Sequence, residues 1–398
     1  IGDRRQRQMC IRDSLGTGSI AKAFAEALKE TDGELLAVAS ANGQRAIEFC
    51  NSYGGTAIEG HMNLISMPDI DAIYIATPHT SHFEFASACL KQKKAVLCEK
   101  PITINATETM ALIDLSRKNK TLLMEAFMYK IHPQTQKIFE IVNRRMKGPL
   151  SIKAEFCFSV DVPDTHRLVN RDLGGGSILD IGCYPMSISR HAVGALYDKN
   201  FVNPIKIQGE GELNHQDIDL NASAELIFED GSVAKIRSAT NLSSESDVTI
   251  SDGEMTIYVN QPWHCGEFTG RKSQIKIVNA NSEEELIDIK TDKGIYALEI
   301  DHFAEAFFNE ELESTLLPHN DSHGNMIALD QWRRELKVVY DDDRGEKRKV
   351  SVISRNDSRD TPLSTKIPGL DKNLSRLFLA ATINLIQIMH SQCLIIFI

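Results

Sequence analysis

The sequence has little cysteine, no excess of positive charge and no recognisable secretory signal. Its eight cysteines include no C-x-x-C pair and are too sparse for a disulfide framework, so we expect reduced thiols and a cytoplasmic protein. Lys and Arg number 44 against 55 Asp and Glu, and both nucleic acid and anionic membranes require basic patches. We therefore expect neither as a partner. The first fourteen residues contain four arginines and no apolar stretch of about 7–15 residues, so we expect no secretory signal there.

The only long uncharged segment is Leu377–Ile398 at the C-terminal end. Its length alone would permit a membrane span. Polar residues such as Asn384 and His390 interrupt it, so we expect a buried element or a foreign tail instead.

The N-terminal end contains a conflict between charge and burial. Arg12 and Asp13 stand where a buried strand should lead into Gly16, and two adjacent charges are costly to bury. Either the first strand is short and distorted, or residues 1–14 are a disordered or non-native lead-in.

The length and a change of pattern near Gly148 predict two domains, because a single core stops growing at about 250–300 residues. Residues 15–126 alternate apolar runs with helical periodicities, as in a doubly wound α/β domain. Residues 127–345 contain longer alternating runs and predict a mostly antiparallel sheet. The expected strands are Leu35–Ser40, Asp71–Ala76, Ala95–Cys98, Thr121–Glu125, Leu150–Val160, Pro204–Leu213, Leu220–Phe228, Ser232–Ala239, Glu254–Val259 and Gln274–Val278.

A glycine turn at the entrance of a predicted helix over Ile20–Glu30 fits G-x-G-x-x-A. The first glycine makes the tight turn, and the second lets the backbone approach a pyrophosphate at the helix N-terminus. The alternative is a glycine turn without a ligand. The predicted cofactor-binding residues are Gly16, Thr17, Gly18, Ser19 and Ile20.

The end of the second strand bears on which cofactor binds. An acidic residue there would hold the ribose hydroxyls of NAD, but the sequence continues from Ser40 to Arg45 without one. Ser40 and Arg45 could meet a 2′-phosphate, which favours NADP and leaves NAD as the alternative. Arg45 could also be a solvated residue of the next helix.

Two further motifs contain residues that could take part in catalysis or substrate binding. Glu99 and Lys100 follow directly on a buried strand, and strand ends of this kind face the ligand crevice. In Gly174–Pro185, a helix over Ser177–Arg190 would place Asp180 and Tyr184 on one face. A carboxylate and a phenol there suit a polyol site with a proton-transfer group, although each motif alone could be structural.

Together the motifs resemble the glucose–fructose oxidoreductase / inositol dehydrogenase (Gfo/Idh/MocA) family. The resemblance covers about residues 15–340, and the tyrosine in the last motif is most similar to the trans-dihydrodiol dehydrogenase and NADP-dependent D-xylose 1-dehydrogenase branches. The segments that carry it are GTGSIA (16–21), ATPHTSH (76–82), CEKP (98–101), MEAFMYKIHPQ (124–134) and LGGGSILDIGCYP (173–185).

The resemblance implies a Rossmann domain followed by an α+β domain with a large open sheet that forms a homodimer. It implies catalytic roles for Lys100 and Tyr184, the latter as proton-transfer residue, and for Asp180, which also binds substrate. His132 and Arg167 are further substrate-binding candidates; Lys130 stands where close relatives often have Arg. The residues expected along the cofactor are Thr77, Pro78, His79, His82, Glu99 and Lys100. No metal is expected.

Residues 346–398 do not continue this pattern. Lys366–Asp371 is similar to the opening strand of aldo-keto reductases, so the segment could be the truncated start of a fused second enzyme.

The sequence therefore predicts an NAD(P)-dependent dehydrogenase for a sugar or cyclic diol, with Tyr184 as base and Lys100 stabilising its phenolate. One alternative is a non-catalytic NADP-binding regulator, which would not need both Lys100 and Tyr184. Another is a reductase of an imine or biliverdin-like substrate, which would not need the carboxylate of Asp180.

Overall fold

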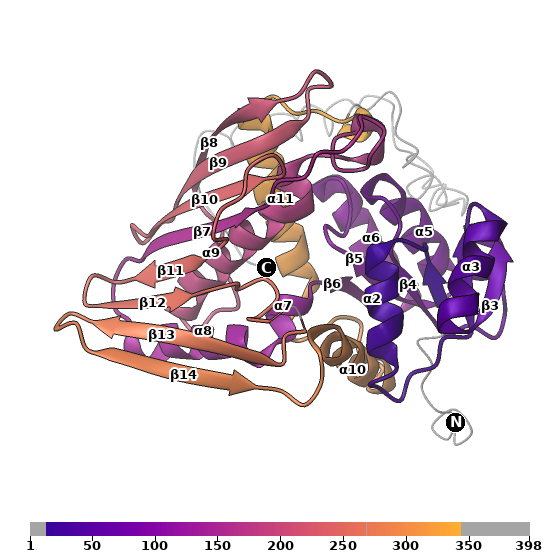
Figure 1. Ribbon diagram of the computed structural model, residues 1–398, viewed down its shortest axis with the longest axis horizontal. Helices are drawn as coiled ribbons and strands as arrows, with labels where there is room; N and C mark the ends of the chain where they lie inside the picture. The colour runs from indigo at the N-terminus through magenta and orange to yellow at the C-terminus, as the bar shows by residue number, and fades with distance from the viewer. Residues whose placement is uncertain (1–12, 268, 344–398) are drawn as a thin grey trace, which may run out of the picture. The chain divides into compact units, whose positions relative to one another are not determined.

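The N-terminal part of the chain forms a six-stranded parallel sheet, on the right of Figure 1. The computed structural model describes residues 13–267 and 269–343. The strand order β3-β2-β1-β4-β5-β6 is the doubly wound arrangement that we predicted, and ligands bind such sheets where the order reverses, outside β1 and β4. The strands are β1 (Asp13–Leu15), β2 (Ala37–Ser40), β3 (Thr56–Glu59), β4 (Ala72–Ile75), β5 (Ala95–Glu99) and β6 (Leu123–Ala126).

The central strand β1 is only three residues long and pairs with both β2 and β4. Ser14 and Leu15 are buried. Asp13 and Ser14, which we placed in the doubtful lead-in, therefore belong to the sheet, because pairing on both sides satisfies their backbone groups. The remaining part of that lead-in, residues 1–12, lies outside the described residues.

Helices connect these strands and cover the sheet. In α2, the residues Ala21, Phe24, Ala25, Ala27 and Leu28 are buried at helical spacing, as the periodicity predicts. The start of α6 is fixed by Asn105, whose side chain accepts from the Glu108 amide at 3.0 Å. The helices are α2 (Ser19–Leu28), α3 (Gly43–Tyr53), α4 (His61–Ile65), α5 (His79–Lys91) and α6 (Ala106–Asn119).

A second, eight-stranded sheet follows, on the left of Figure 1, in the order β14-β13-β12-β11-β7-β10-β9-β8. Within it β7 and β10 pair in parallel and the other described pairs are antiparallel, as expected. Strands β3, β11 and β14 were not predicted. Strands β3 and β14 are sheet edges with largely exposed residues, so neither shows a clear apolar face, and β11 is only four residues long. The strands are β7 (Ser151–Cys157), β8 (Lys206–Leu213), β9 (Asp219–Ile227), β10 (Val233–Ala239), β11 (Val248–Ser251), β12 (Met255–Val259), β13 (Lys272–Asn279) and β14 (Glu284–Lys290).

One face of the second sheet is covered by helices. All 13 residues of α9 are buried, because this helix packs on β7 and β10 and is flanked by α8 and α11. Helix α10 packs against α2 and α7, which joins the second part of the chain to the first. These helices are α7 (Met128–Ile131), α8 (Pro133–Arg145), α9 (Cys183–Ala195), α10 (Ile295–Phe308) and α11 (His319–Glu335).

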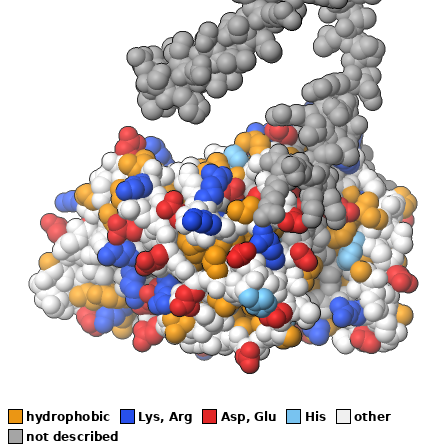
Figure 2. Space-filling view, turned by 90° about the horizontal axis from the view of Figure 1, so that it is seen from above, with side chains coloured by type: hydrophobic (Ala, Val, Ile, Leu, Met, Phe, Trp, Pro, Cys, Tyr) orange, Lys and Arg blue, Asp and Glu red, His pale blue; other side chains and the backbone are white. Residues whose placement is uncertain are grey.

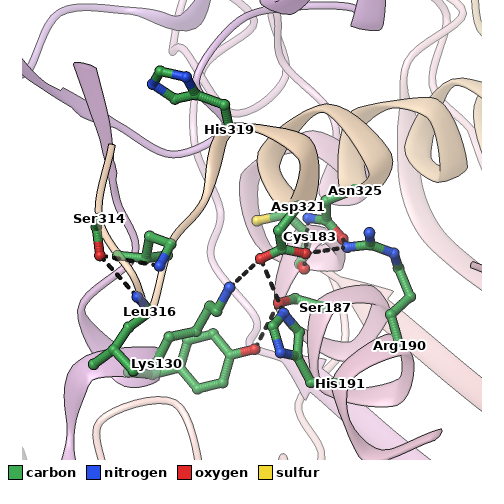
Figure 3. Close-up of polar contacts among 12 residues, drawn as sticks. Lys130, Cys183, Ser187, Arg190, His191, Ser314, Leu316, His319, Asp321 and Asn325 are labelled. Carbon is green, nitrogen blue, oxygen red and sulfur yellow. Dashed lines mark hydrogen bonds and ion pairs between the residues drawn. The ribbon is translucent and has the colours of Figure 1, made fainter. Parts of the chain in front are cut away.

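A buried group of charged side chains ties α7, α9 and α11 together (Figure 3). Asp321 of α11 accepts from Lys130, from Arg190 Nη1 at 2.8 Å and from His191 Nε2 at 2.9 Å. All four side chains are at most 6% exposed. Burial alone would raise the pKa of Asp321, but His191, Lys130 and Arg190 hold it well below its usual value. The carboxylate is therefore charged and fixes α9 against its neighbours.

On the face shown in Figure 2, basic and acidic side chains are interspersed and form no continuous basic region. No helix within residues 13–267 and 269–343 combines the length and apolarity needed to cross a membrane. Two predictions lie outside these ranges: the possible start of a fused second enzyme in residues 346–398, and the buried element or foreign tail expected at 377–398. The cysteines in the described ranges are free thiols.

Candidate active site

The turn between β1 and α2 has the shape that a dinucleotide pyrophosphate requires. Gly16 has φ +113°, and a Cβ there would lie 2.5 Å from the Ala76 carbonyl oxygen, so the position needs glycine. A Cβ on Gly18 would meet nothing within 4 Å. Helix α2 begins at Ser19 with no side-chain cap and no acidic residue in its first turn, which leaves its first N–H groups for an anion. The segment from Gly16 through Thr17 to Ile20 therefore fits the phosphates of a dinucleotide.

The carboxyl end of β2 brings together residues from two strands. Ser40 is buried and accepts from the Asn42 amide at 3.3 Å, while Arg45 is exposed in the first turn of α3. Asn42 caps that turn through its side-chain oxygen. Glu59, at the end of β3, lies beside Gly43, where a Cβ would be 3.1 Å from Oε2. Sequence reasoning missed this carboxylate, because it comes from a strand that was not predicted.

Thr77 and Pro78 lie in the loop after β4, and His82 lies just beyond it in α5. Thr77 is partly exposed and Pro78 is exposed, so both can face a ligand. The ring nitrogens of His82 lie 2.8 Å from the Thr77 carbonyl oxygen and 3.0 Å from that of Pro101. Burial lowers the pKa of His82 to about 4, so the ring is neutral near pH 7. We expected His82 to line the cofactor; it is fully buried and links the loops after β4 and β5 instead.

His79 is also internal, although it lies close to the predicted catalytic residues. Its Nδ1 is 3.1 Å from the Gly174 carbonyl oxygen, and its Nε2 is 4.0 Å from Asp180 Oδ1. Burial lowers the pKa of His79 to about 3, so it is neutral near pH 7. It connects α5 to the triple glycine, a contact that its expected role along the cofactor did not include.

Glu99 is the buried last residue of β5. Its carboxylate accepts from the Tyr74 hydroxyl at 2.6 Å and from the Lys100 amide at 3.2 Å. Burial raises the pKa of this carboxyl. The two hydrogen bonds fix the backbone that presents Lys100.

Lys100, Asp180 and Arg167 meet in one group. Asp180 Oδ1 lies 2.8 Å from Arg167 Nη1 and 3.8 Å from Lys100 Nζ, and Lys100 Nζ also donates to the Asp180 backbone carbonyl at 2.5 Å. The side chain of Asp180 is 7% exposed and that of Arg167 is 47% exposed. Burial alone would raise the pKa of Asp180, but Lys100, Arg167 and His79 hold it far below its usual value. Asp180 is therefore a charged hydrogen-bond acceptor beside Lys100 and Arg167.

Tyr184 lies beside this group in an aromatic wall. Lys100 Nζ is 5.2 Å from the centroid of its ring, and its hydroxyl donates to Met128 Sδ at 3.3 Å. Burial raises the pKa of Tyr184 well above 10, and Tyr296, Cys183 and Glu99 add to the effect. The rings around it are those of Phe127, Tyr129, Phe156 and Trp263.

The position of the Lys100 ammonium relative to the Tyr184 hydroxyl differs from the expected one. We expected the ammonium at the phenolate oxygen, where it would lower the pKa of Tyr184. Instead the ammonium lies over the ring face, in the position of a cation–π contact. The protonated phenol is the stable form in this arrangement.

The helix that carries Asp180 and Tyr184 also differs from the expected one. Ile178–Gly182 is a π-helical turn, and α9 begins only at Cys183. The simple i, i+4 relation between Asp180 and Tyr184 is therefore wrong, although both residues still converge on Lys100. Single π turns inside helices often occur at functional sites.

His132 does not face the site as we expected. Its side chain caps α8 by accepting from the Gln134 amide at 3.1 Å, and its Nε2 lies 2.6 Å from the Gly270 carbonyl oxygen. His132 is 1% exposed, so neither ring nitrogen is left for a substrate. The neighbouring Lys130 is bound to Asp321 in the buried charged group.

Asp219 holds the start of the helix that carries the candidate residues. Its Oδ2 accepts from the Ile178 amide at 2.6 Å and from Ser177 Oγ at 2.9 Å. Its Oδ1 is buried and has no hydrogen-bond partner among the described residues. Burial raises the pKa of Asp219 from 3.8 to about 6, so folding makes this carboxyl bind its proton more tightly.

Asp219→Asn should therefore change how stability depends on pH. In the wild type, the raised pKa of Asp219 contributes fully to the free energy of unfolding below pH 3.8. This contribution is lost as the pH rises through about 6. Relative to the Asn variant, the wild type should lose about 3 kcal/mol in free energy of unfolding between about pH 4 and about pH 8. Urea denaturation of both proteins at several pH values measures this difference. A difference that stays constant across this range would contradict the raised pKa.

Residues 13–267 and 269–343 contain no group of three His, Cys, Asp or Glu side chains that could hold a metal ion. The site is built from a dinucleotide turn, one ammonium, one carboxylate and one phenol.

Comparison with known proteins agrees with this architecture. Residues 15–127 match the model of an oxidoreductase family with an NAD-binding Rossmann fold. The chain is 32% identical over 228 residues to D-xylose 1-dehydrogenase (NADP(+)) 2 of Haloferax volcanii, an alignment that covers 56% of this chain and 68% of the relative. It is 27% identical over 345 residues to trans-1,2-dihydrobenzene-1,2-diol dehydrogenase of Xenopus tropicalis, which covers 81% of this chain and 97% of the relative.

A solved structure shows the same fold. A 3-ketoreductase from Actinomadura kijaniata, solved with NADP and TDP-benzene, superposes with a TM-score of 0.73 at 24% identity, over 83% of this chain and 98% of that one. The two-sheet arrangement, the dinucleotide turn and the identity to the xylose dehydrogenase lead to one conclusion. The chain belongs to the Gfo/Idh/MocA family of oxidoreductases with an NAD-binding Rossmann fold.

Proposed function

We propose that this oxidoreductase uses NADP to transfer hydride between nicotinamide C4 and a hydroxyl-bearing carbon of a sugar or cyclic diol. The observation that carries the proposal is the convergence of Lys100 Nζ, the Asp180 carboxylate and the Tyr184 ring at the carboxyl end of β5. A hydride reaction of this kind needs a proton-transfer group and an acceptor that orients the substrate hydroxyls, and this site offers both.

Residues of the first sheet would hold the cofactor, which supplies the hydride chemistry when bound. The uncapped start of α2 after Gly16 and Gly18 suits the pyrophosphate. Ser40 and the exposed Arg45 suit a 2′-phosphate, and Thr77 and the exposed Pro78 would line the crevice. The carboxylate of Glu59, beside Gly43, would repel a bound 2′-phosphate, which makes the preference for NADP over NAD worth measuring.

Asp180 would orient the substrate. Within the described residues, Arg167, Lys100 and His79 all approach its Oδ1. A substrate hydroxyl could donate to Oδ2, and the charged state of Asp180 keeps this acceptor strong across the working pH range.

Tyr184 would exchange the proton. Since burial favours the protonated phenol, it is ready to donate to a carbonyl oxygen as hydride reaches the adjacent carbon. In the opposite direction the phenol must first lose its proton, which Lys100 can assist only by moving from the ring face toward the hydroxyl. The site therefore favours carbonyl reduction over alcohol oxidation at neutral pH.

A screen in both directions tests the proposal. The full chain is mixed with NADP or NAD and a panel of aldoses, inositols and trans-dihydrodiols, or with the reduced cofactors and the matching ketones, and the absorbance of the reduced nicotinamide is followed. We expect turnover with members of one of these classes, faster with the NADP pair. Tight cofactor binding without turnover of any of them would favour a non-catalytic regulator.

Arg45→Ala should weaken NADP binding selectively. Loss of one arginine–phosphate contact should raise the Kd for NADP about tenfold, ~1.4 kcal/mol, and leave the Kd for NAD within about twofold. Titration by intrinsic fluorescence with each cofactor measures both values. Equal weakening of NAD and NADP would show that Arg45 does not read the 2′-phosphate.

We further propose a homodimer formed through the uncovered face of the second sheet, in a cytoplasmic enzyme. A shallow hollow over β7, β9 and β10 is lined by Lys153, Glu155, Ser223, Lys235 and Arg237 together with apolar residues. Light scattering of the purified chain measures the oligomeric state, and charge reversal at Arg237 should shift a dimer toward monomer.

A further inference from the structure

The acid that the carboxyl end of β2 lacks is present at the carboxyl end of the neighbouring strand. Strands β2 and β3 pair in parallel with Ser40 opposite Glu59, so both strand ends lie at the same edge of the sheet. Directly opposed residues of a parallel pair point to the same face, so the side chains of Ser40 and Glu59 point to one side. Helix α3 packs on both strands (Figure 1). A carboxylate therefore stands one strand away from the usual position of a ribose-binding acid.

The side chain of Glu59 reaches the loop that joins β2 to α3. A Cβ on Gly43 would lie 3.1 Å from Glu59 Oε2 and 3.3 Å from Glu59 Cβ, so the carboxylate lies against the Gly43 backbone. Arg45 follows two residues later, in the first turn of α3. Glu59 and Arg45 thus border the same short loop.

Hydrogen bonds hold the backbone of Glu59 and leave its carboxylate available. The Gly60 amide donates to the Ser40 carbonyl at 2.8 Å, and Asn63 Nδ2 donates to the Glu59 carbonyl at 2.8 Å. Both Glu59 and Arg45 are exposed. Within residues 13–267 and 269–343, no ion pair includes either side chain, and no group donates to the Glu59 carboxylate. An anion and a cation therefore stand beside this loop with their hydrogen-bonding atoms open to a ligand.

These two groups suit the two forms of the adenosine ribose. In NAD the ribose has a free 2′-hydroxyl, which a carboxylate binds as an acceptor. In NADP the same position carries a phosphate, which an arginine binds and a carboxylate repels. Arg45 and Glu59 therefore act in opposite directions on the choice of cofactor.

We infer that Glu59 takes the place of the acid missing from β2 and holds the ribose 2′-hydroxyl of NAD, so that the site binds NAD as well as NADP. The inference rests on the cofactor site of the proposed function. It is independent of the proposed substrate and of the role of Tyr184.

Glu59→Gln should shift the cofactor preference toward NADP. Loss of the charged acceptor should raise the Kd for NAD about fivefold, and loss of the repulsion should lower the Kd for NADP about threefold. Fluorescence titration of the full chain, without substrate, measures both constants. Glu59 is an exposed residue of an edge strand, so the substitution should leave the fold intact. A ratio of the two constants that changes less than about threefold overturns the inference.

Glu48→Gln is the matched control. Glu48 is exposed one turn further along the helix that carries Arg45, where it accepts from Gln44 Nε2 at 3.2 Å. Its substitution changes the net charge by the same amount, and salt screening should keep both Kd values within about twofold. The same shift in Glu48→Gln as in Glu59→Gln would reveal a general charge effect and overturn the inference.

An NAD analogue without the adenosine 2′-hydroxyl tests the hydrogen bond itself. The wild type should bind 2′-deoxy-NAD about fivefold more weakly than NAD, whereas Glu59→Gln should bind the two within about twofold. Equal binding of the two by the wild type overturns the inference even if Glu59→Gln shifts the preference, because the carboxylate would then act on the phosphate alone.

These titrations separate the inference from the proposed function, since none of them needs turnover. A chain that binds both cofactors through these residues but converts no substrate of the panel upholds the role of Glu59 and contradicts the proposed reaction. Turnover with NADP and no measurable binding of NAD upholds the reaction and overturns the role of Glu59.

Discussion

Replacing Tyr184 with phenylalanine should lower turnover by about 10²–10⁴-fold, the usual contribution of a general acid–base group. The substitution keeps the ring and its packing and removes only the hydroxyl that contacts Met128 Sδ. NADP binding should change less than about threefold, roughly 0.6 kcal/mol, because Tyr184 lies in the second part of the chain, away from the dinucleotide turn. Steady-state kinetics on the best substrate of the screen and fluorescence titration of NADP measure both quantities.

Lys100→Met should cost at least as much, and the two losses should not add. Lys100 Nζ lies over the ring of Tyr184 and against Asp180, and in the proposed mechanism Lys100 and Tyr184 serve one proton transfer. The double variant should therefore resemble the slower single variant. Near-normal turnover of Tyr184→Phe would show that Tyr184 only packs, and the proton would then have to be exchanged by Lys100. His132 could not take over that role, because both of its ring nitrogens are engaged.

Asp321→Asn should lower the free energy of unfolding by several kcal/mol. It removes the anion from between Lys130 and Arg190, whose side chains are 1% and 0% exposed. Breaking a buried ion pair from one side leaves a charge uncompensated and costs about 3–5 kcal/mol, and in this group two cations lose their partner. Urea denaturation at neutral pH measures the free energy of unfolding.

Glu140→Gln is the matched control for this substitution. Glu140 also contacts two cations, Lys137 and Arg144, but on the exposed surface of α8, so we expect no measurable change in the free energy of unfolding. Adding Lys130→Met to Asp321→Asn should recover part of the lost stability, because one uncompensated cation is removed. A loss below about 1 kcal/mol in Asp321→Asn would contradict the view that this charged group fixes α9.

The fold was largely predictable where burial imposes a pattern on the sequence. The apolar runs at β2, β4 and β5 are buried at every position and read clearly as parallel strands. Strands β3 and β14 were missed because edge strands expose both faces, and the internal strand β11 was missed because four residues are too few to show a clear alternation. Of the two alternatives for the N-terminal end, a short first strand is the one that the structure has: β1 begins only at Asp13, and its backbone pairs with β2 and β4.

In the site, sequence reasoning identified the residues better than their contacts. Lys100, Asp180 and Tyr184 lie next to one another in the structure, whereas their expected roles stay predictions. The internal positions of His79, His82 and His132 could not be read from spacing, because each depends on backbone carbonyls that come from other segments of the fold. The π turn before Pro185 carries no periodicity signal of its own, although a proline just inside a predicted helix indicates an irregular hydrogen-bond pattern.

The most direct measurement for the central claim follows the hydride itself. NADPH carrying deuterium at the transferable position of nicotinamide C4 is incubated with the full chain and a panel of keto-sugars and cyclic hydroxyketones, and the products are analysed by mass spectrometry. We predict that the products of one class gain a single deuterium on the former carbonyl carbon, and that Tyr184→Phe slows this gain by at least about 10²-fold. Saturating NADPH binding with no deuterium in any product, or equal labelling by wild type and Tyr184→Phe, would contradict the account.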